Sequence, residues 1–239
     1  MAGERLARIL GLLSGGGVSN VAPADLCAVG HGVTDTTGAG IMLVVGDALQ
    51  GSLCSTDEVS RSLEDLQYTL GEGPCIDASR HDRPVLEPDL VAPTRPRWPA
   101  FTPPAVDTGA RAIFGFPLQV GTVRLGALNL YRDRPGPLSQ DAHADALVVA
   151  GVIGQALLVM QSRTEEGTVP AQLEAGANLR YVVHQAAGVA SVQMGVPLPE
   201  ALARLRAHAY AADRPLDEVA EAVVGRRLRF DPEGDARAT

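Results

Sequence analysis

The chain has 239 residues, 46% of them hydrophobic and 20% charged, which excludes a chain that is disordered throughout. That length exceeds what one small module needs and predicts two domains. The formal net charge of −8 is uneven: Gln172–Phe230 holds seven arginines and six acidic residues, while the rest carries −9. A segment charge of +1 is weak for nucleic-acid binding, so only a cluster of arginines could make a basic face there.

The cysteines and the long apolar segments indicate the cellular compartment of the protein and whether it contacts a membrane. Cys27, Cys54 and Cys75 are odd in number and have neither metal nor disulfide spacing, which predicts a reducing cytoplasm, no metal site and no disulfide. No segment resembles a secretory signal. Ala146–Ser162 is the one membrane candidate, but it falls short of about 20 strongly apolar residues. We expect it to be a helix buried against its own sheet and against a partner subunit, with no membrane contact.

Helical and strand patterns alternate along the first two thirds of the chain. Helical spacing occurs at 1–13, 22–31, 57–68 and from Ser139, as the capping residue, to Arg163. Short apolar runs bounded by turn residues predict strands at 40–45, 49–56, 110–120 and 123–131. The last two should form a central hairpin, in which Pro117 demands a strand end, an edge or a bulge. Helices before and after antiparallel strands indicate an α+β fold.

Three helices are predicted in the last quarter of the chain. Apolar residues recur at a period near 3.6 from Ala171 to a left-handed cap at Gly195, and again after Pro197 and after Pro215. Arg226, together with Arg227 and Arg229, is expected in the last turn of the third helix, where positive charge opposes the helix dipole.

This last segment resembles an ANTAR domain, a three-helix RNA-binding module of bacterial antitermination regulators. The words VHQAAGVASVQMGV and EALARLRAHAYAADRPLDEVAEAVVGRRL carry the resemblance, which covers about 60 residues. Many members have lysine where this chain has Ala187, so any RNA contact of that lysine is absent here. The resemblance implies an RNA face and paired stem-loops in mRNA leaders as partners; Tyr210 would stack on a loop base and the arginines would hold phosphates. The candidate residues are Gln185, Gly188, Arg204, Tyr210, Arg214 and Arg226.

The preceding segment resembles a GAF domain of the form fused to ANTAR in actinobacterial regulators. The words LGEGPCIDA, RWPAF and FPLQVGTVRLGALNLYRDRPGPLS carry this resemblance over about residues 22–163. It implies a small-molecule signal whose identity is unknown, as is any cofactor. The expected organisation is a GAF-like sensor domain at 1–163, a linker at 164–171, an all-α ANTAR domain at 172–230 and a disordered acidic tail at 231–239.

The loop around Gly71–Cys75 and a Pro-rich stretch hold the sensor candidates. Glu72 and Asp77 could accept hydrogen bonds from a ligand, Cys75 could contact it or act as a thiol sensor, and Trp98 could cover a pocket mouth. The alternative is structural: a turn with a buried thiol, and a tryptophan that anchors the loop. A GAF-fold thiol reductase would need Cys54 and Cys75 with α-carbons less than about 7 Å apart. The sequence has no P-loop, nucleophile elbow or zinc motif, so no catalytic residue is predicted.

Together these patterns predict a cytoplasmic, dimeric, non-enzymatic antitermination regulator. A sensor half would respond to a signal, and the C-terminal half would bind RNA. Two alternatives stay open: a thiol redox sensor or reductase, and a sensor that acts only through protein association. Any phosphorylation would require a separate kinase, since the chain lacks the acidic pocket pattern of a receiver domain.

Overall fold

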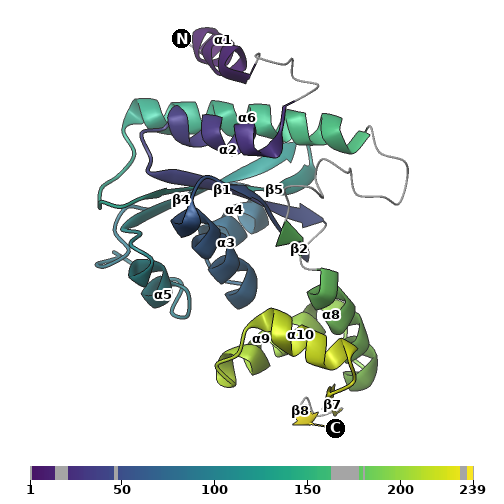
Figure 1. Ribbon diagram of the computed structural model, residues 1–239. Coiled ribbons are helices and arrows are strands. Elements are labelled where there is room, and N and C mark those ends of the chain that lie inside the picture. Colours follow the sequence, from purple (N-terminus) through teal and green to yellow (C-terminus); the bar gives the residue numbers. More distant parts are fainter. Residues whose placement is uncertain are drawn as a thin grey trace. The chain divides into compact units, whose positions relative to one another are not determined.

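The computed structural model describes residues 2–13, 21–45, 48–162, 178–179, 181–231 and 236–238. The chain divides into two compact units, Met1–Tyr68 with Glu72–Leu179 and Arg180–Thr239 with Thr69–Gly71. The first unit is α+β and the second mainly α-helical, which confirms the predicted fold class (Figure 1). The expected linker at 164–171 lies outside the described residues.

An antiparallel sheet of order β3-β4-β5-β1-β2-β6 forms the centre of the first unit. Its strands are β1 (Gly38–Val45), β2 (Ala48–Ser55), β3 (Val85–Glu87), β4 (Ala112–Val120), β5 (Val123–Arg132) and β6 (Asn178–Leu179). The predicted hairpin is formed by β4 and β5, the second and third strands in the sheet order. Because β3 pairs with β4 only as far as Gly115, Pro117 lies beyond the last paired residue on that side, where its missing N–H is tolerated.

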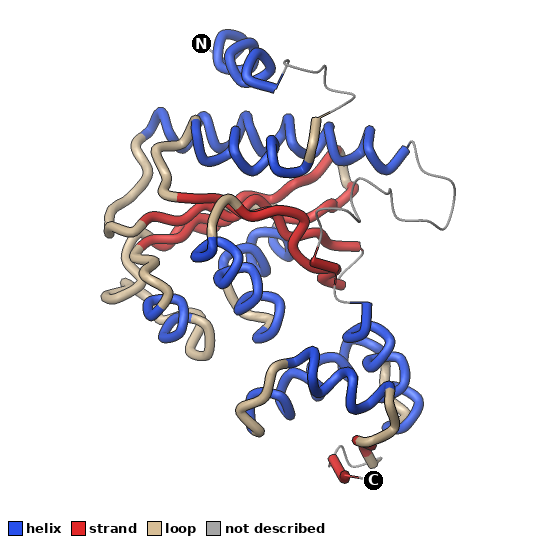
Figure 2. The backbone as a smooth tube through the Cα atoms, viewed as in Figure 1, coloured by secondary structure: helices blue, strands red, loops and turns tan. Residues whose placement is uncertain are grey.

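Helices cover both faces of this sheet. On one face lie α2 (Pro23–Gly32) and α6 (Gln140–Ser162), and on the other lie α3 (Glu58–Leu70) and α4 (Pro74–His81) (Figure 2). Alternating strand residues such as Phe114, Phe116, Leu128 and Leu130 join Ile153 of α6 in the hydrophobic core, all fully buried. Burial of each such side chain stabilises the fold by about 1.5–3 kcal/mol, so this face holds the unit together.

Two further helices complete the first unit. α1 (Ala2–Leu13) is fastened to α6 by ion pairs from Arg5 and Arg8 to Asp145, at 2.9 and 2.6 Å. α5 (Thr102–Asp107) interrupts the Pro-rich stretch. The predicted cap of α6 is confirmed, since the Ala142 backbone N–H donates to Ser139 Oγ at 3.1 Å. Gln140–Gln161 is the one helix among the described residues that is long and apolar enough to cross a membrane, yet more than half of its most apolar segment is buried inside the protein, as in a core helix.

A disulfide corrects one expectation from the sequence. Cys27 on α2 and Cys54 on β2 are bonded, with their α-carbons 6.3 Å apart, so the prediction of no disulfide is wrong. Twenty-seven positions separate the two cysteines, and no local spacing motif marks such a pair. They meet because α2 packs across β1 and β2.

The second unit contains the three predicted helices, α8 (Tyr181–Met194), α9 (Leu198–Ala211) and α10 (Leu216–Val224). Gly195 has φ +67°, which confirms the predicted left-handed cap. The sequence predicts the first helix from Ala171, and its described part, α8, begins at Tyr181. Asn178 and Leu179 are extended and pair with β2, and residues 171–177 lie outside the described part of the chain.

The end of the chain also differs from expectation. α10 ends at Val224, and Arg226 has φ 58°, so the three arginines follow the helix instead of occupying its last turn. The apolar spacing continues to Leu228, but that residue opens β7 (Leu228–Phe230), which pairs with β8 (Ala236–Ala238). β7 lies at the end of the predicted ANTAR segment and β8 in the predicted tail at 231–239; residues 232–235 between them are not described.

Candidate functional site

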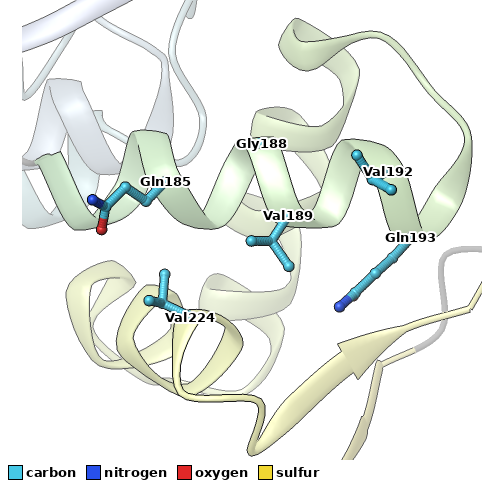
Figure 3. Close-up of a pocket in the computed structure, with 6 residues that line it drawn as sticks. All are labelled: Gln185, Gly188, Val189, Val192, Gln193 and Val224. Carbon is cyan, nitrogen blue, oxygen red and sulfur yellow. The ribbon is translucent and has the colours of Figure 1, made fainter.

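An open groove of about 660 Å³ runs along α8 in the second unit. Five of its lining residues lie on α8 and Val224 faces them from α10, as Figure 3 shows. Two are predicted RNA-binding residues, Gln185 and Gly188; the others are Val189, Val192, Gln193 and Val224. The structure therefore brings Gln185 and Gly188 together on one surface.

The chemistry of this groove is mostly apolar. Val192 is 85% exposed and Val224 is 40% exposed, so valine methyl groups face solvent there. Gln193 is already engaged, because its Oε1 accepts a hydrogen bond from the Phe230 backbone N–H at 2.9 Å. A groove of this kind suits the side chains of a packed helix better than a phosphate, which needs cations or several N–H donors.

The other predicted RNA-binding residues lie outside the groove lining. Arg204 on α9 forms an ion pair with Glu200 at 2.7 Å, and Arg214 one with Glu218 at 3.7 Å. Tyr210, near the end of α9, is 67% exposed and leaves a ring face free for stacking. Arg226 is exposed just after α10. Each side chain reaches the surface, but two arginines share their charge with carboxylates.

Ala187, which stands where many ANTAR domains have lysine, has a structural role. Its side chain is fully buried in the second unit, beside Ala186 and Ala190. A lysine would have to leave this interior to reach RNA, since an unpaired buried ammonium is strongly disfavoured. In this chain position 187 serves packing, so the alanine removes no cation from the surface.

Three sensor candidates are engaged in holding the Pro-rich loop. Glu72 Oε2 accepts from the backbone N–H groups of Ala100 and Phe101, at 2.9 and 3.2 Å. Trp98 is buried, and its Nε1 donates to Asp77 Oδ2 at 3.0 Å. These contacts agree with the structural alternative for Glu72, Asp77 and Trp98, since their polar atoms point at the loop.

Cys75, the fourth sensor candidate, is buried at the start of α4. Its backbone N–H donates to Gln67 Oε1 at 2.8 Å. Burial, and to a lesser degree the nearby Glu64, raises the pKa of the thiol well above its ordinary value, which keeps it protonated and a poor nucleophile. Cys54 is bonded to Cys27, so the Cys54–Cys75 pair required by the reductase alternative is not formed.

A buried polar cluster near Cys75 was missed from the sequence. Glu64 and Gln67 on α3 and Asn129 on β5 are almost fully enclosed. Burial raises the pKa of the Glu64 carboxyl to about 8, while Asn129 opposes the rise and Asp65 adds to it. The sequence signal for this cluster is that Glu64 and Gln67 lie on the same helical face as Leu63, which is buried.

Comparisons with known proteins agree with this division of the chain. The ANTAR domain family matches residues 171–224. The chain resembles the GAF domain of a phosphoenolpyruvate-protein phosphotransferase from Coxiella burnetii, with 12% identity and a TM-score of 0.52 over 68% of this chain and 95% of that one. That coverage is longer than the second unit, so the match must extend over much of the first unit, and at such low identity it shows the fold alone.

Two further solved structures are similar at lower scores. The free methionine-R-sulfoxide reductase from Neisseria meningitidis has 19% identity and a TM-score of 0.44, covering 68% of this chain and 92% of its own. A GAF domain from A. aeolicus has 13% identity and a TM-score of 0.45, covering 66% and 96%. No curated protein sequence matches the chain. The chain therefore joins an N-terminal domain of GAF fold to a C-terminal segment that matches the ANTAR domain family.

Proposed function

We propose that this protein is a cytoplasmic, signal-responsive regulator that binds RNA through its ANTAR domain and promotes transcription antitermination. The ANTAR match over residues 171–224, on a three-helix unit with exposed Tyr210 and Arg226, carries this proposal. The RNA face comprises Arg204, Tyr210, Arg214 and Arg226, with the tyrosine stacking on an unpaired loop base and the arginines holding phosphates.

A homodimer would give two such faces for paired stem-loops. Its support is a stripe on α8 of exposed Tyr181, Gln185 and Val192 with half-buried Gly188, which follow the alternating four- and three-residue spacing of a coiled-coil seam. Gln185 and Gly188, which the ANTAR resemblance offers as RNA contacts, would lie in this seam. On α6, exposed Leu147, Gly151 and Leu158 form a second stripe that a partner subunit could cover. Two linked RNA contacts bind much more tightly than one, which offsets the weak charge of each ANTAR domain.

The test is binding of the full chain to an RNA with two hairpins in a salt titration. For about three phosphates contacted in single-stranded loops, log K should fall with log salt at a slope near −2. Arg204→Ala should weaken binding about tenfold and flatten the slope by about 0.7. Glu200→Gln is the matched control, because it removes the carboxylate that shares the Arg204 charge and should leave binding equal or stronger. Salt-independent binding, or equal losses in both variants, would rule out Arg204 as a phosphate contact.

A further inference from the structure

The centre of the sheet carries a row in which asparagine lies between two glycines. Asn129 of β5 is paired in register with Gly40 of β1 on one side and with Gly115 of β4 on the other. A Cβ at Gly40 would lie 2.8 Å from Cδ of Glu64, and one at Gly115 would lie 2.5 Å from the Pro74 carbonyl oxygen. The two glycines therefore let α3 and the start of α4 approach the sheet closely, on the face where the Asn129 side chain lies.

Several polar atoms at this place have no hydrogen-bond partner. Glu64 Oε1 and Oε2, Asn129 Oδ1 and Gln67 Nε2 are all buried and, among the described residues, have no partner at ordinary hydrogen-bond distance and angle, although the Asn129 side chain is close enough to Glu64 to oppose the rise in its pKa. The side chains of Glu64 and Gln67 are 0% exposed and that of Asn129 is 2% exposed. Buried polar groups are nearly always paired, because each unpaired group costs a few kcal/mol of stability. Four unpaired atoms converging from two elements indicate a site that a ligand completes.

The unpaired atoms also define the chemistry of that ligand. When Glu64 is ionised, three of them are acceptors and one is a donor, so the group that complements this form must be rich in N–H donors. Around Glu64 lie Cys75 of α4, Asn129 of β5 and, on its own helix, Asp65, none of them a cation. In the described part of the chain no arginine forms an ion pair with Glu64. A positive ligand group would thus meet an acceptor with no competing positive side chain.

We propose that Glu64, Gln67 and Asn129 form the recognition end of the sensor site and bind a small organic cation of the amidinium or guanidinium class. Two parallel N–H groups of the ligand donate to the two Glu64 oxygens, and a third N–H donates to Asn129 Oδ1. Gln67 Nε2 donates to an acceptor elsewhere on the ligand. This assignment rests on the sensor role proposed above and names the class of signal. Entry requires local opening of α3 and α4, because all three side chains are enclosed.

The site couples binding to proton release. Without a ligand the Glu64 carboxyl holds its proton at neutral pH, because burial raises its pKa to about 8. A cation favours the ionised form, so one proton leaves Glu64 as the ligand binds. Affinity should therefore increase about fivefold between pH 7 and pH 8, and level off above that range.

Three probes with the same ring test the proposal: benzamidine, which is cationic, benzamide, which is neutral, and benzoate, which is anionic. Calorimetry on the full chain at pH 7 and pH 8 should show benzamidine binding at least about tenfold more tightly than benzamide, and no benzoate binding. Glu64→Gln should abolish both the preference and the pH dependence. It should fold, because glutamine resembles the protonated carboxyl that the protein already contains. Glu58→Gln, an exposed change on the same helix, should retain wild-type behaviour.

Equal binding of benzamidine and benzamide, or undiminished benzamidine binding by a folded Glu64→Gln variant, would overturn the proposal. The same preparations are titrated with the two-hairpin RNA. RNA binding without discrimination among the probes would refute the ligand class and leave the regulator assignment standing. Probe discrimination without RNA binding would refute the RNA function and leave the ligand class standing.

Discussion

At the residue scale, one buried carboxyl should make the stability of the sensor domain depend on pH. Burial raises the pKa of Glu64 to about 8 from an ordinary value of 4.5. Between these values the folded state holds a proton that the unfolded state has lost. The contribution of Glu64 to stability is therefore complete below the unfolded pKa and declines as pH rises through the folded one.

We predict that the free energy of unfolding falls by up to about 1.4 kcal/mol per pH unit between roughly pH 5 and 8 through this residue. Urea unfolding of the wild type and of Glu64→Gln at pH 5, 6.5 and 8 measures it. The two proteins should be similar at pH 5, and the variant should be the more stable at pH 8. Parallel pH profiles for the two would show that Glu64 does not titrate in this range.

The roles of individual side chains were harder to predict from the sequence than the helices and strands. Glu72, Asp77 and Trp98 are attractive in sequence because they lie in a glycine-rich loop and a Pro-rich stretch. Which atoms their side chains meet depends on tertiary contacts, and these turned out to be loop backbone and each other. Conversely, Glu64 sits in an ordinary helix, and only its position on the buried face distinguishes it. A polar residue within an apolar helical stripe is thus the more informative signal here.

At the scale of elements, the Cys27–Cys54 bond joins α2 to β2 across the hydrophobic core. Closing this loop restricts the unfolded chain, which for a loop of this length stabilises the folded state by about 3 kcal/mol. The bond acts on the sheet face opposite α3 and α4. Its loss should therefore destabilise the whole first unit without removing a polar group from the Glu64 cluster.

We predict that protein unfolded without reductant titrates one free thiol, that of Cys75, and three after reduction. Reduction should lower the free energy of unfolding by about 3 kcal/mol. The double variant Cys27→Ser with Cys54→Ser should show the same loss and no response to reductant, whereas Cys75→Ser should still respond. Three titratable thiols in the unreduced protein would mean that the bond does not form.

Most elements follow from the sequence because their signals are local. Glycine-bounded apolar runs predicted four strands, and Ser139 predicted the start of α6 through its capping oxygen. The four additional strands, β3, β6, β7 and β8, have only two or three residues each, too few for a periodic pattern. Asn178 and Leu179 fall within a stretch of helical spacing but are extended, because pairing with β2 overrides that local preference.

At the scale of the whole molecule, the exposed seam on α8 determines whether two RNA faces can act together. Val192 is 85% exposed, so a charge there should not disturb the fold of a single chain. In a dimer the same position would be enclosed against a second copy. A buried unpaired carboxylate would be costly, and the dimer should dissociate.

We predict that Val192→Glu is monomeric by sedimentation and binds a two-hairpin RNA roughly 100-fold more weakly than the wild type. Its affinity for a single hairpin should be unchanged. Val123→Glu, at an exposed position beside the β4–β5 turn, is the control and should remain dimeric. A dimeric Val192→Glu variant would place the association surface elsewhere.

The short β7–β8 hairpin affects where the chain can be truncated to give an isolated RNA-binding domain. The family match stops at residue 224, but Phe230 beyond it is buried, meets the His208 ring edge-on at 5.6 Å and hydrogen-bonds Gln193 through its backbone. A fragment trimmed at the family boundary would uncover the side of α8 and α9 that Phe230 shields and would invite aggregation. An isolated RNA-binding piece should therefore be cut no earlier than Asp231.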